Sequence, residues 1–145
     1  MSNRPILLGK GRSGEVWGLS DTLVQKRYNL SKKEIISDSF IRDVAGHRIL
    51  GKPEIESVTI DCVHDKPVIH MNIERFTSTL RSMPHHMINF HKLTCQLTLT
   101  LHSLHSQRIS HRDITASNVF YDRVKDEYIL GDFDGMSLYP CTGTN

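Results

Sequence analysis

The sequence predicts an α+β fold, in which a lobe built on an antiparallel five-stranded sheet precedes a second, mainly helical lobe. Short apolar stretches broken by turn residues fill most of the first 76 positions, which is the pattern of strands joined in hairpins. From Met87 to Gln107 the apolar residues recur at intervals of three and four, as on one face of a helix. The composition changes between Thr77 and His86. We therefore place residues 1–76 in the first lobe and residues 77–145 in the second.

The first lobe begins with three predicted strands and a helix. From Ile6 to Tyr28 the chain reads as strand, glycine turn, strand, turn at Ser20-Asp21 and strand, which is an antiparallel meander. A capping box at residues 31–34, Ser-Lys-Lys-Glu, predicts the start of a helix, because Ser and Glu at this spacing satisfy free amides of the first turn. Gly46 weakens this helix, since an interior Gly costs about 1 kcal/mol relative to Ala.

A hairpin completes the predicted sheet, and one long helix opens the second lobe. Alternating apolar residues at 58–62, a polar turn at 64–67 and a strand over 68–74 supply the fourth and fifth strands. The helix should run from Met87 to Gln107. Two short strands, Asn118 to Tyr121 and Tyr128 to Asp132, should follow it.

Charge and composition argue against several classes of function. Lys and Arg number 18 against 16 Asp and Glu, a formal net charge of +2, and no basic run is long enough to bind nucleic acid. No stretch approaches the roughly 18 consecutive apolar residues of a membrane-spanning helix, and the N-terminus lacks the apolar core of a signal peptide. We therefore expect an intracellular protein, cytoplasmic or nuclear, that binds neither nucleic acid nor membranes. Its three widely spaced cysteines should be reduced thiols, and its nine histidines lack the spacing of metal ligands.

A glycine-rich turn lies between the first two predicted strands. Gly9, Gly11 and Gly14, followed by Val16, fit the pattern G-x-G-x-x-G-x-V, in which small residues let backbone amides approach phosphate groups. A dinucleotide-binding turn would continue into a helix, whereas a strand follows here. The alternative for the turn is a hairpin that binds no ligand.

Lys26 lies on the third predicted strand. Strand alternation puts it on the same face as Val24, from where it can reach phosphate oxygens beneath the glycine turn. The alternative is a solvated strand lysine.

The segment 111–118, His-Arg-Asp-Ile-Thr-Ala-Ser-Asn, follows the long helix directly. Its Asp113 can accept the proton of an attacking hydroxyl, and Asn118 can bind a magnesium ion from the start of the next strand. Asp132, in an Asp-Phe-Asp-Gly stretch after the last predicted strand, can complete the magnesium site. Together with the glycine turn and Lys26, these residues indicate phosphoryl transfer from ATP.

In the order and spacing of these motifs the chain resembles the eukaryotic protein kinases. The residues within its His-Arg-Asp-Ile-Thr and Asp-Phe-Asp motifs are most similar to those of divergent fungal-type and small atypical members. The resemblance covers the chain from the N-terminus through the magnesium-binding segment. It implies a protein-kinase-like fold that binds ATP and Mg²⁺. It further implies that the three glycines cover the phosphates, that Val16 and Val24 pack the adenine, and that Lys26 binds the α- and β-phosphates.

The resemblance also assigns residues behind and below the nucleotide. Glu74, Arg75 and Phe76 would form the hinge whose backbone receives the adenine, and Ile73 would guard the rear pocket. By the same resemblance Asp113 would be the catalytic base, and Asn118 and Asp132 would be the metal ligands.

Two positions depart from the family's pattern. The regulatory helix of the family offers a Glu to the strand lysine, whereas Gly46 occupies that place here. The ion pair is then either absent or rebuilt from Asp43, one turn earlier. Thr115 stands where Ser/Thr kinases carry a Lys near the γ-phosphate, which predicts slower chemistry unless Lys10 or Arg12 compensates.

A third departure concerns length, because the chain ends ten residues after Gly135. We expect a C-terminally truncated kinase that lacks the family's later helices, which leaves Leu97, Leu101 and Leu104 without cover. A partner chain, or a dimer formed through the uncovered face of the second lobe, would then be needed.

Three functions are compatible with this pattern. The first is an ATP-dependent protein kinase that transfers the γ-phosphoryl group to a Ser/Thr hydroxyl of a protein substrate, slowly. The second is a truncated pseudokinase that acts as a binding or regulatory protein for a kinase or another partner. The third is a relic of a longer enzyme. The intact Lys26, Asp113, Asn118 and Asp132 favour retained chemistry over a relic.

Overall fold

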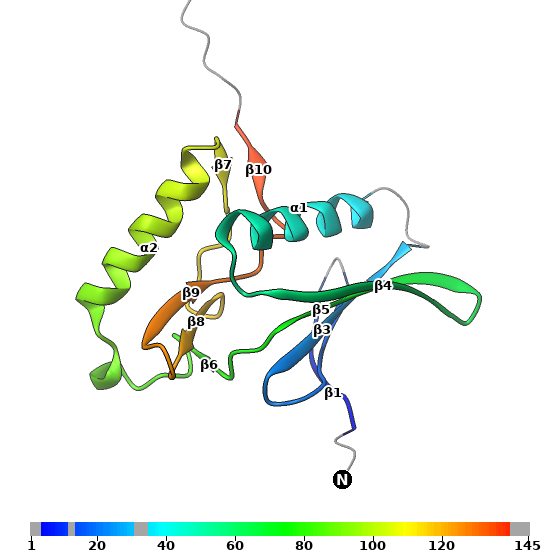
Figure 1. The fold of residues 1–145 in the computed structure, drawn as a ribbon, viewed down its shortest axis with the longest axis horizontal. Coiled ribbons are helices and arrows are strands. Elements are labelled where there is room, and N and C mark those ends of the chain that lie inside the picture. Colours follow the sequence, from blue (N-terminus) through cyan, green and yellow to red (C-terminus); the bar gives the residue numbers. More distant parts are fainter. Residues whose placement is uncertain (1–3, 12–13, 31–34, 140–145) are drawn as a thin grey trace, which may run out of the picture.

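Five strands form one antiparallel sheet in the order β1-β2-β3-β5-β4 (Figure 1). The computed structural model of the chain describes residues 4–11, 14–30 and 35–139. The strands are β1 (Ile6–Lys10), β2 (Gly14–Gly18), β3 (Leu23–Asn29), β4 (Ile55–Val63) and β5 (Lys66–Glu74). The α+β class, the meander and the hairpin are therefore confirmed. β4 begins earlier than the alternation indicates, because its pairing with β5 slips between Ile55 and Ser57 and interrupts the period of two.

The helix α1 (Ile35–Leu50) lies between this sheet and the second lobe (Figure 1). On the sheet side Phe40 packs edge to face against Tyr28, with ring centroids 5.4 Å apart. The buried cluster beneath it consists of Val24, Tyr28, Ile69, Met71 and Ile73. The helix continues through Gly46 to Leu50, so packing outweighs the low helix propensity of glycine. The predicted capping box at 31–34 lies outside the described residues.

The second lobe combines one α-helix with short strands. Its elements are β6 (Ser78–Thr79), the 3-10 helix η2 (His85–Met87), α2 (Phe90–His105), β7 (Ile109–Ser110), β8 (Val119–Asp122), β9 (Glu127–Leu130) and β10 (Ser137–Leu138). β6, β8 and β9 form a three-stranded sheet, and β7 pairs with β10. Among the described residues of this lobe α2 and η2 are the only helices, so its helical part is smaller than the sequence predicts. The two-residue strands are too short to leave a period in the sequence.

The start of α2 differs from the prediction. The helix begins at Phe90 rather than Met87, because Asn89 caps it by accepting a hydrogen bond from the Lys92 amide at 3.0 Å. The preceding turn is the separate 3-10 helix η2. None of the helices in the described part of the chain is both long and apolar enough to cross a membrane.

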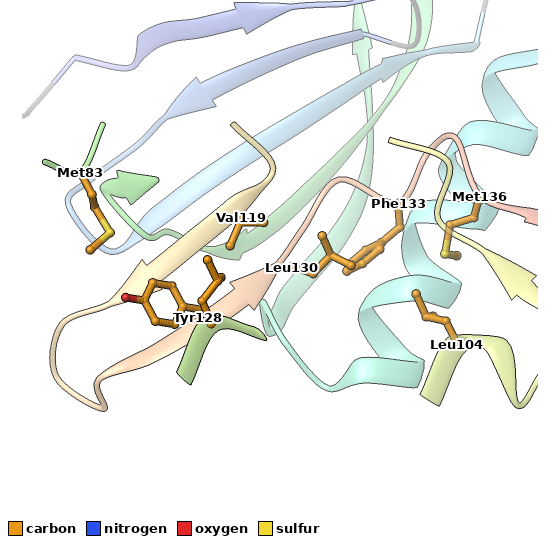
Figure 2. Close-up of a cluster of buried hydrophobic side chains, with 8 residues drawn as sticks. Met83, Leu104, Val119, Tyr128, Leu130, Phe133 and Met136 are labelled. Atoms are coloured by element: carbon orange, nitrogen blue, oxygen red, sulfur yellow. The ribbon is translucent and has the colours of Figure 1, made fainter. Parts of the chain in front are cut away.

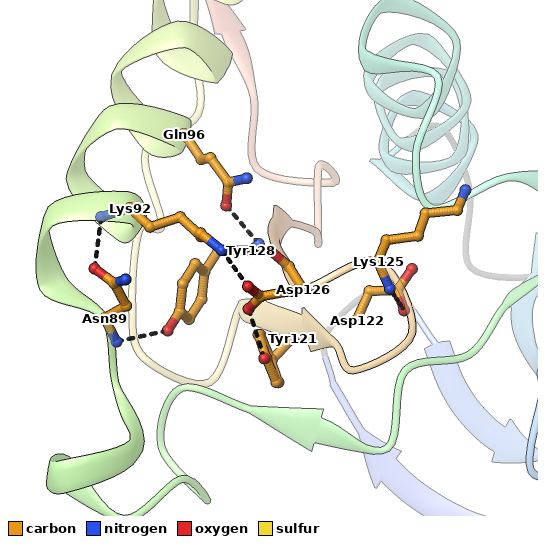
Figure 3. A network of polar contacts seen from close by, with 8 residues as sticks. All are labelled: Asn89, Lys92, Gln96, Tyr121, Asp122, Lys125, Asp126 and Tyr128. Carbon is orange, nitrogen blue, oxygen red and sulfur yellow. Dashed lines mark hydrogen bonds and ion pairs between the residues drawn. The ribbon is translucent and has the colours of Figure 1, made fainter.

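A polar network ties α2 to the β8–β9 hairpin, as Figure 3 shows. The Tyr128 amide donates to the Gln96 side chain at 2.8 Å, and the Tyr128 hydroxyl accepts from the Asn89 amide at 2.9 Å. Lys92 forms an ion pair with Asp126 at the hairpin turn. The two hydrogen bonds of the buried Tyr128 hold the hairpin in place and, with it, the segments 111–118 and 131–135 at its two ends, whereas the exposed Lys92–Asp126 pair adds little.

The second buried cluster lies between α1, α2 and the β8–β9 hairpin. It consists of Met83, Leu93, Leu104, Val119, Tyr128, Leu130, Phe133 and Met136 (Figure 2). Leu104 is fully buried, and Leu97 and Leu101 pack against the cluster. The prediction that these three leucines lack cover is therefore wrong, because β9 and the Phe133 segment cover this face of α2. The exposed apolar residues of α2 are Phe90 and Leu99 instead.

Candidate functional site

A cleft with a volume of about 500 Å³ lies between the five-stranded sheet and the second lobe. This volume is within the range of small-molecule sites. The predicted site residues that line it are Gly9, Gly11, Gly14, Val16, Val24, Lys26, Glu74, Phe76 and Asp132. Two other predicted residues, Asp113 and Asn118, are not part of the lining.

The glycine turn closes one side of the cleft. Gly11 donates its amide hydrogen to the Gly14 carbonyl at 2.8 Å. A Cβ atom at Gly14 would lie 1.9 Å from the Arg27 carbonyl oxygen of β3, so only glycine fits there. A Cβ at Gly9 or Gly11 would meet no described atom within 4 Å. Gly14 is thus required by the close approach of β3, whereas Gly9 and Gly11 leave open space over the cleft.

The rear wall of the cleft is the end of β5 and the residues that follow it. Ile73 is buried and lines the cleft at the position predicted for a rear guard. The next residue but one, Arg75, donates its amide hydrogen to the Thr22 carbonyl at 2.9 Å, which fixes the segment against the β2–β3 turn. Glu74 and Phe76 lie on either side of this anchor and form part of the wall.

Lys26 has its partner in Asp43 on α1. The Lys26 Nζ atom lies 2.6 Å from Asp43 Oδ2, and the Tyr28 hydroxyl donates to the same oxygen. The other carboxylate oxygen, Oδ1, accepts the Phe133 amide hydrogen at 3.0 Å. Asp43 is fully buried and the Lys26 side chain is 15% exposed. Of the two alternatives that the sequence left open, the pair rebuilt from Asp43 is the one present.

The charges of this pair stabilise each other. Burial acts to lower the pKa of Lys26, but the carboxylates of Asp43 and Asp132 outweigh it and raise this pKa above its ordinary value. Burial likewise acts to raise the pKa of Asp43, but the charge of Lys26 and the hydrogen bonds from Lys26 and Tyr28 outweigh it and lower this pKa. Both groups therefore remain ionised at neutral pH, with the ammonium at the inner end of the cleft.

Asp132 and Asp134 bring two further carboxyl groups to the cleft. The backbone of Asp132 is left-handed, with φ at 57°, which aspartate tolerates better than most residues. Burial raises the pKa of Asp132 to about 7; Lys26 opposes this rise, and Asp134 adds to it by its charge and a hydrogen bond. Asp134 is not among the predicted site residues, although its spacing of two from Asp132 could have indicated that both carboxyl groups meet.

Asp113 and Asn118 lie next to each other beside the cleft. The Asn118 side-chain amide donates to Asp113 Oδ2 and to the Asp113 carbonyl oxygen, both at 2.9 Å. His111 connects them to the cleft, because it accepts the Asp113 amide hydrogen at Nδ1 and its Nε2 lies 2.8 Å from the Gly131 carbonyl oxygen. Gly131 also donates to the Asn118 carbonyl at 2.9 Å. Asp113 is exposed and so accessible to a large substrate.

The acidic groups fit a magnesium ion that is shared with a phosphate ligand. Mg²⁺ prefers oxygen ligands and is usually bound by one or two carboxylates together with substrate phosphates. In the part of the chain that the structure describes, no group of three or more His, Cys, Asp and Glu side chains is arranged to hold a metal ion. Asp132 and Asp134 could therefore supply protein ligands, but a nucleotide would have to supply others.

Comparison with models of protein families finds none that matches this chain. Comparison with curated proteins finds no relative either. The assignment of a function therefore depends on the motifs and on the geometry of the cleft.

Proposed function

We propose that this chain is a kinase-like protein that binds Mg²⁺-ATP in the cleft and transfers the γ-phosphoryl group to a Ser/Thr hydroxyl of a protein. The observation that carries the proposal is the convergence of Lys26, Asp43 and Asp132 below the glycine turn. These residues come from β3, α1 and the segment after β9, far apart in the sequence. A solvated strand lysine, the alternative for Lys26, would not be largely buried against two carboxylates.

Lys26 would bind the phosphates of the nucleotide. Its ammonium group is held in one place by Asp43, so little side-chain entropy remains to be lost when an anion binds. Phosphate oxygens would then share the three donors of the ammonium group with Asp43. Val16 and Val24 line the cleft between the glycine turn and Ile73, where apolar contacts suit a base.

Asp132 and Asp134 would hold the magnesium ion from the cleft lining, and Asn118, which lies beside the cleft, would be a further oxygen ligand as the family resemblance implies. The bound ion would neutralise charge on the β- and γ-phosphates. Because the pKa of Asp132 is about 7, ion binding must displace a proton from part of the population at neutral pH. Affinity for Mg²⁺-ATP should therefore increase as the pH rises through 7.

Asp113 would accept the proton of the attacking hydroxyl. It is exposed beside the cleft, and its carboxylate is oriented by the Asn118 amide. Thr115 supplies no positive charge for the transferred group, so we expect slow transfer. An Asp113→Asn variant should retain nucleotide binding and lose phosphate transfer to a generic protein substrate.

Thermal unfolding with and without Mg²⁺-ATP tests the binding step. A ligand at 100 times its Kd stabilises the folded state by about 2.7 kcal/mol, and Lys26→Met should lose most of that gain. Lys92→Met is the matched control, because Lys92 forms an ion pair with Asp126 on the surface of the second lobe, away from the cleft. An equal gain in all three proteins, or none in the wild type, would contradict the proposal.

A second function, nucleotide binding without transfer in a pseudokinase that regulates a kinase or another partner, is favoured by one observation. Asp113 and Asn118 lie outside the cleft lining and bond to each other. Radiolabelled ATP distinguishes the two functions. Stabilisation by Mg²⁺-ATP together with no transfer above the Asp113→Asn background would identify the second one.

A further inference from the structure

Gly46 lies where α1 meets the Phe133 ring. A Cβ atom at Gly46 would be 2.2 Å from Cγ of Phe133 and 2.4 Å from its Cβ. Nonbonded carbon atoms pack at about 3.5 Å or more, so any side chain at this position would require the helix or the ring to move by about 1 Å. Phe133 is fully buried and therefore has no free space to move into. The absence of a side chain at Gly46 thus sets how closely α1 approaches this segment.

The same close approach determines the position of Asp43. Residues three apart in a helix lie on one face, so Asp43 and Gly46 meet the same neighbour. Asp43 reaches the Phe133 amide at 3.0 Å with one carboxylate oxygen and Lys26 Nζ at 2.6 Å with the other. One turn on, the His47 ring packs edge to face on Phe133 with centroids 4.9 Å apart. Three successive contacts therefore hold α1 at one distance from Phe133.

Aspartate has a short side chain with no spare length. If a side chain at position 46 moved α1 away from Phe133 by about 1 Å, the 3.0 Å contact of Asp43 Oδ1 with the Phe133 amide would exceed the usual range of a hydrogen bond. The short carboxylate could then no longer reach both the Phe133 amide and Lys26. A longer glutamate at position 43 could span the added distance. The same glutamate in the unaltered protein would be too long for the buried site, because overpacking a close-packed interior forces strained side chains.

We infer that Gly46 is a positioning residue for Lys26: by letting α1 pack directly on Phe133, it allows the short carboxylate of Asp43 to hold the lysine in the cleft. Positions 43 and 46 are then coupled, since a residue with a side chain at 46 requires a longer acid at 43. The effect on nucleotide binding rests on the proposed function, whereas the effect on the Lys26–Asp43 pair does not.

The test compares the full chain with Gly46→Ala, Asp43→Glu and the double variant. NMR titration gives the pKa of the Lys26 side chain, and calorimetry gives the affinity for Mg²⁺-ATP. In Gly46→Ala the pKa of Lys26 should fall, because burial still lowers this pKa while the Asp43 carboxylate, which raises it, is no longer in contact with the ammonium group. Nucleotide affinity should fall about ten- to hundredfold, as expected when one hydrogen bond to a charged group is misaligned. The double variant should recover both.

A matched control and a second single variant keep the outcome decisive. Arg48→Ala changes an exposed residue of the same helix and should leave the pKa of Lys26 and the affinity unchanged. If Gly46→Ala does not fold, Asp43→Glu alone decides, since it should also lower the pKa of Lys26. An unchanged pKa of Lys26 in Gly46→Ala, or in Asp43→Glu, would overturn the inference. Absence of ATP binding by the wild type would refute the proposed function and leave the pKa comparison to decide the role of Gly46.

Discussion

Replacing Asp43 with alanine should destabilise the protein more than any other loss of a single charge among the described residues. The carboxylate is fully buried and contacts Lys26, Tyr28 and the Phe133 amide. Its removal leaves the Lys26 ammonium, whose side chain is 15% exposed, without its nearest counter-charge, and leaves two buried donors unpaired. Removing one partner of a buried ion pair typically costs about 3 to 5 kcal/mol. This is a large part of the roughly 5 to 15 kcal/mol by which domains are stable.

Urea unfolding of Asp43→Ala and of a matched control measures the effect. The control is Asp126→Ala, which removes the same group from an exposed pair with Lys92, where the side chains are 57% and 33% exposed. Exposed pairs contribute about 0 to 1 kcal/mol, so the control should unfold near the wild-type midpoint. Equal costs for the two variants, within about 1 kcal/mol, would refute the reasoning that burial makes the Lys26–Asp43 pair necessary.

Three further predictions concern the cleft and the core. Asp132→Asn should raise the free energy of unfolding at pH 8 but not at pH 4, because a carboxyl whose pKa is raised from 3.8 to about 7 on folding favours the unfolded state as the pH rises between these values. In urea titrations the stability of the wild type should therefore decline over that range. An equal decline in the variant would contradict this. Gly14→Ala should lower the melting temperature because its Cβ would lie 1.9 Å from a carbonyl oxygen of β3, whereas Gly9→Ala, with no described atom within 4 Å, should not. Leu104→Ala should lower the free energy of unfolding by about 2 to 5 kcal/mol in urea, because Leu104 is fully buried. Leu99 is 69% exposed, so Leu99→Ala should lower it by less than about 0.5 kcal/mol. Similar losses in the two variants would place the core elsewhere.

Local chemistry made much of the fold predictable from the sequence. The β4–β5 turn is formed by His64 and Asp65, both with positive φ, 50° and 60°, as a two-residue hairpin turn requires. The leucine spacing that predicts α2 matches the face that it buries, with Leu93 and Leu104 inside. In both places the signal lies within a few residues, so no distant contact is needed to recognise it.

What the sequence could not decide depends on contacts between distant segments. The burial of Leu104 depends on β9 and the Phe133 segment. The prediction that Leu104 lacks cover without further helices was therefore wrong, because no local pattern shows that these distant segments pack on α2. The choice of Asp43 as the partner of Lys26 depends on the distance between α1 and Phe133, which no local pattern records. The pairing of Asp113 with Asn118 beside the cleft, rather than in its lining, likewise follows from the course of one loop.

We propose that Lys26 and Asp132 form the inner end of a nucleotide site. Calorimetric titration of the wild type, Lys26→Met and Lys92→Met with ATP, in the presence of Mg²⁺, tests it most directly. We expect one nucleotide per chain, an affinity at least about tenfold weaker in Lys26→Met, and no change in Lys92→Met. Equal affinities for the two variants, or no heat of binding in the wild type, would contradict the claim.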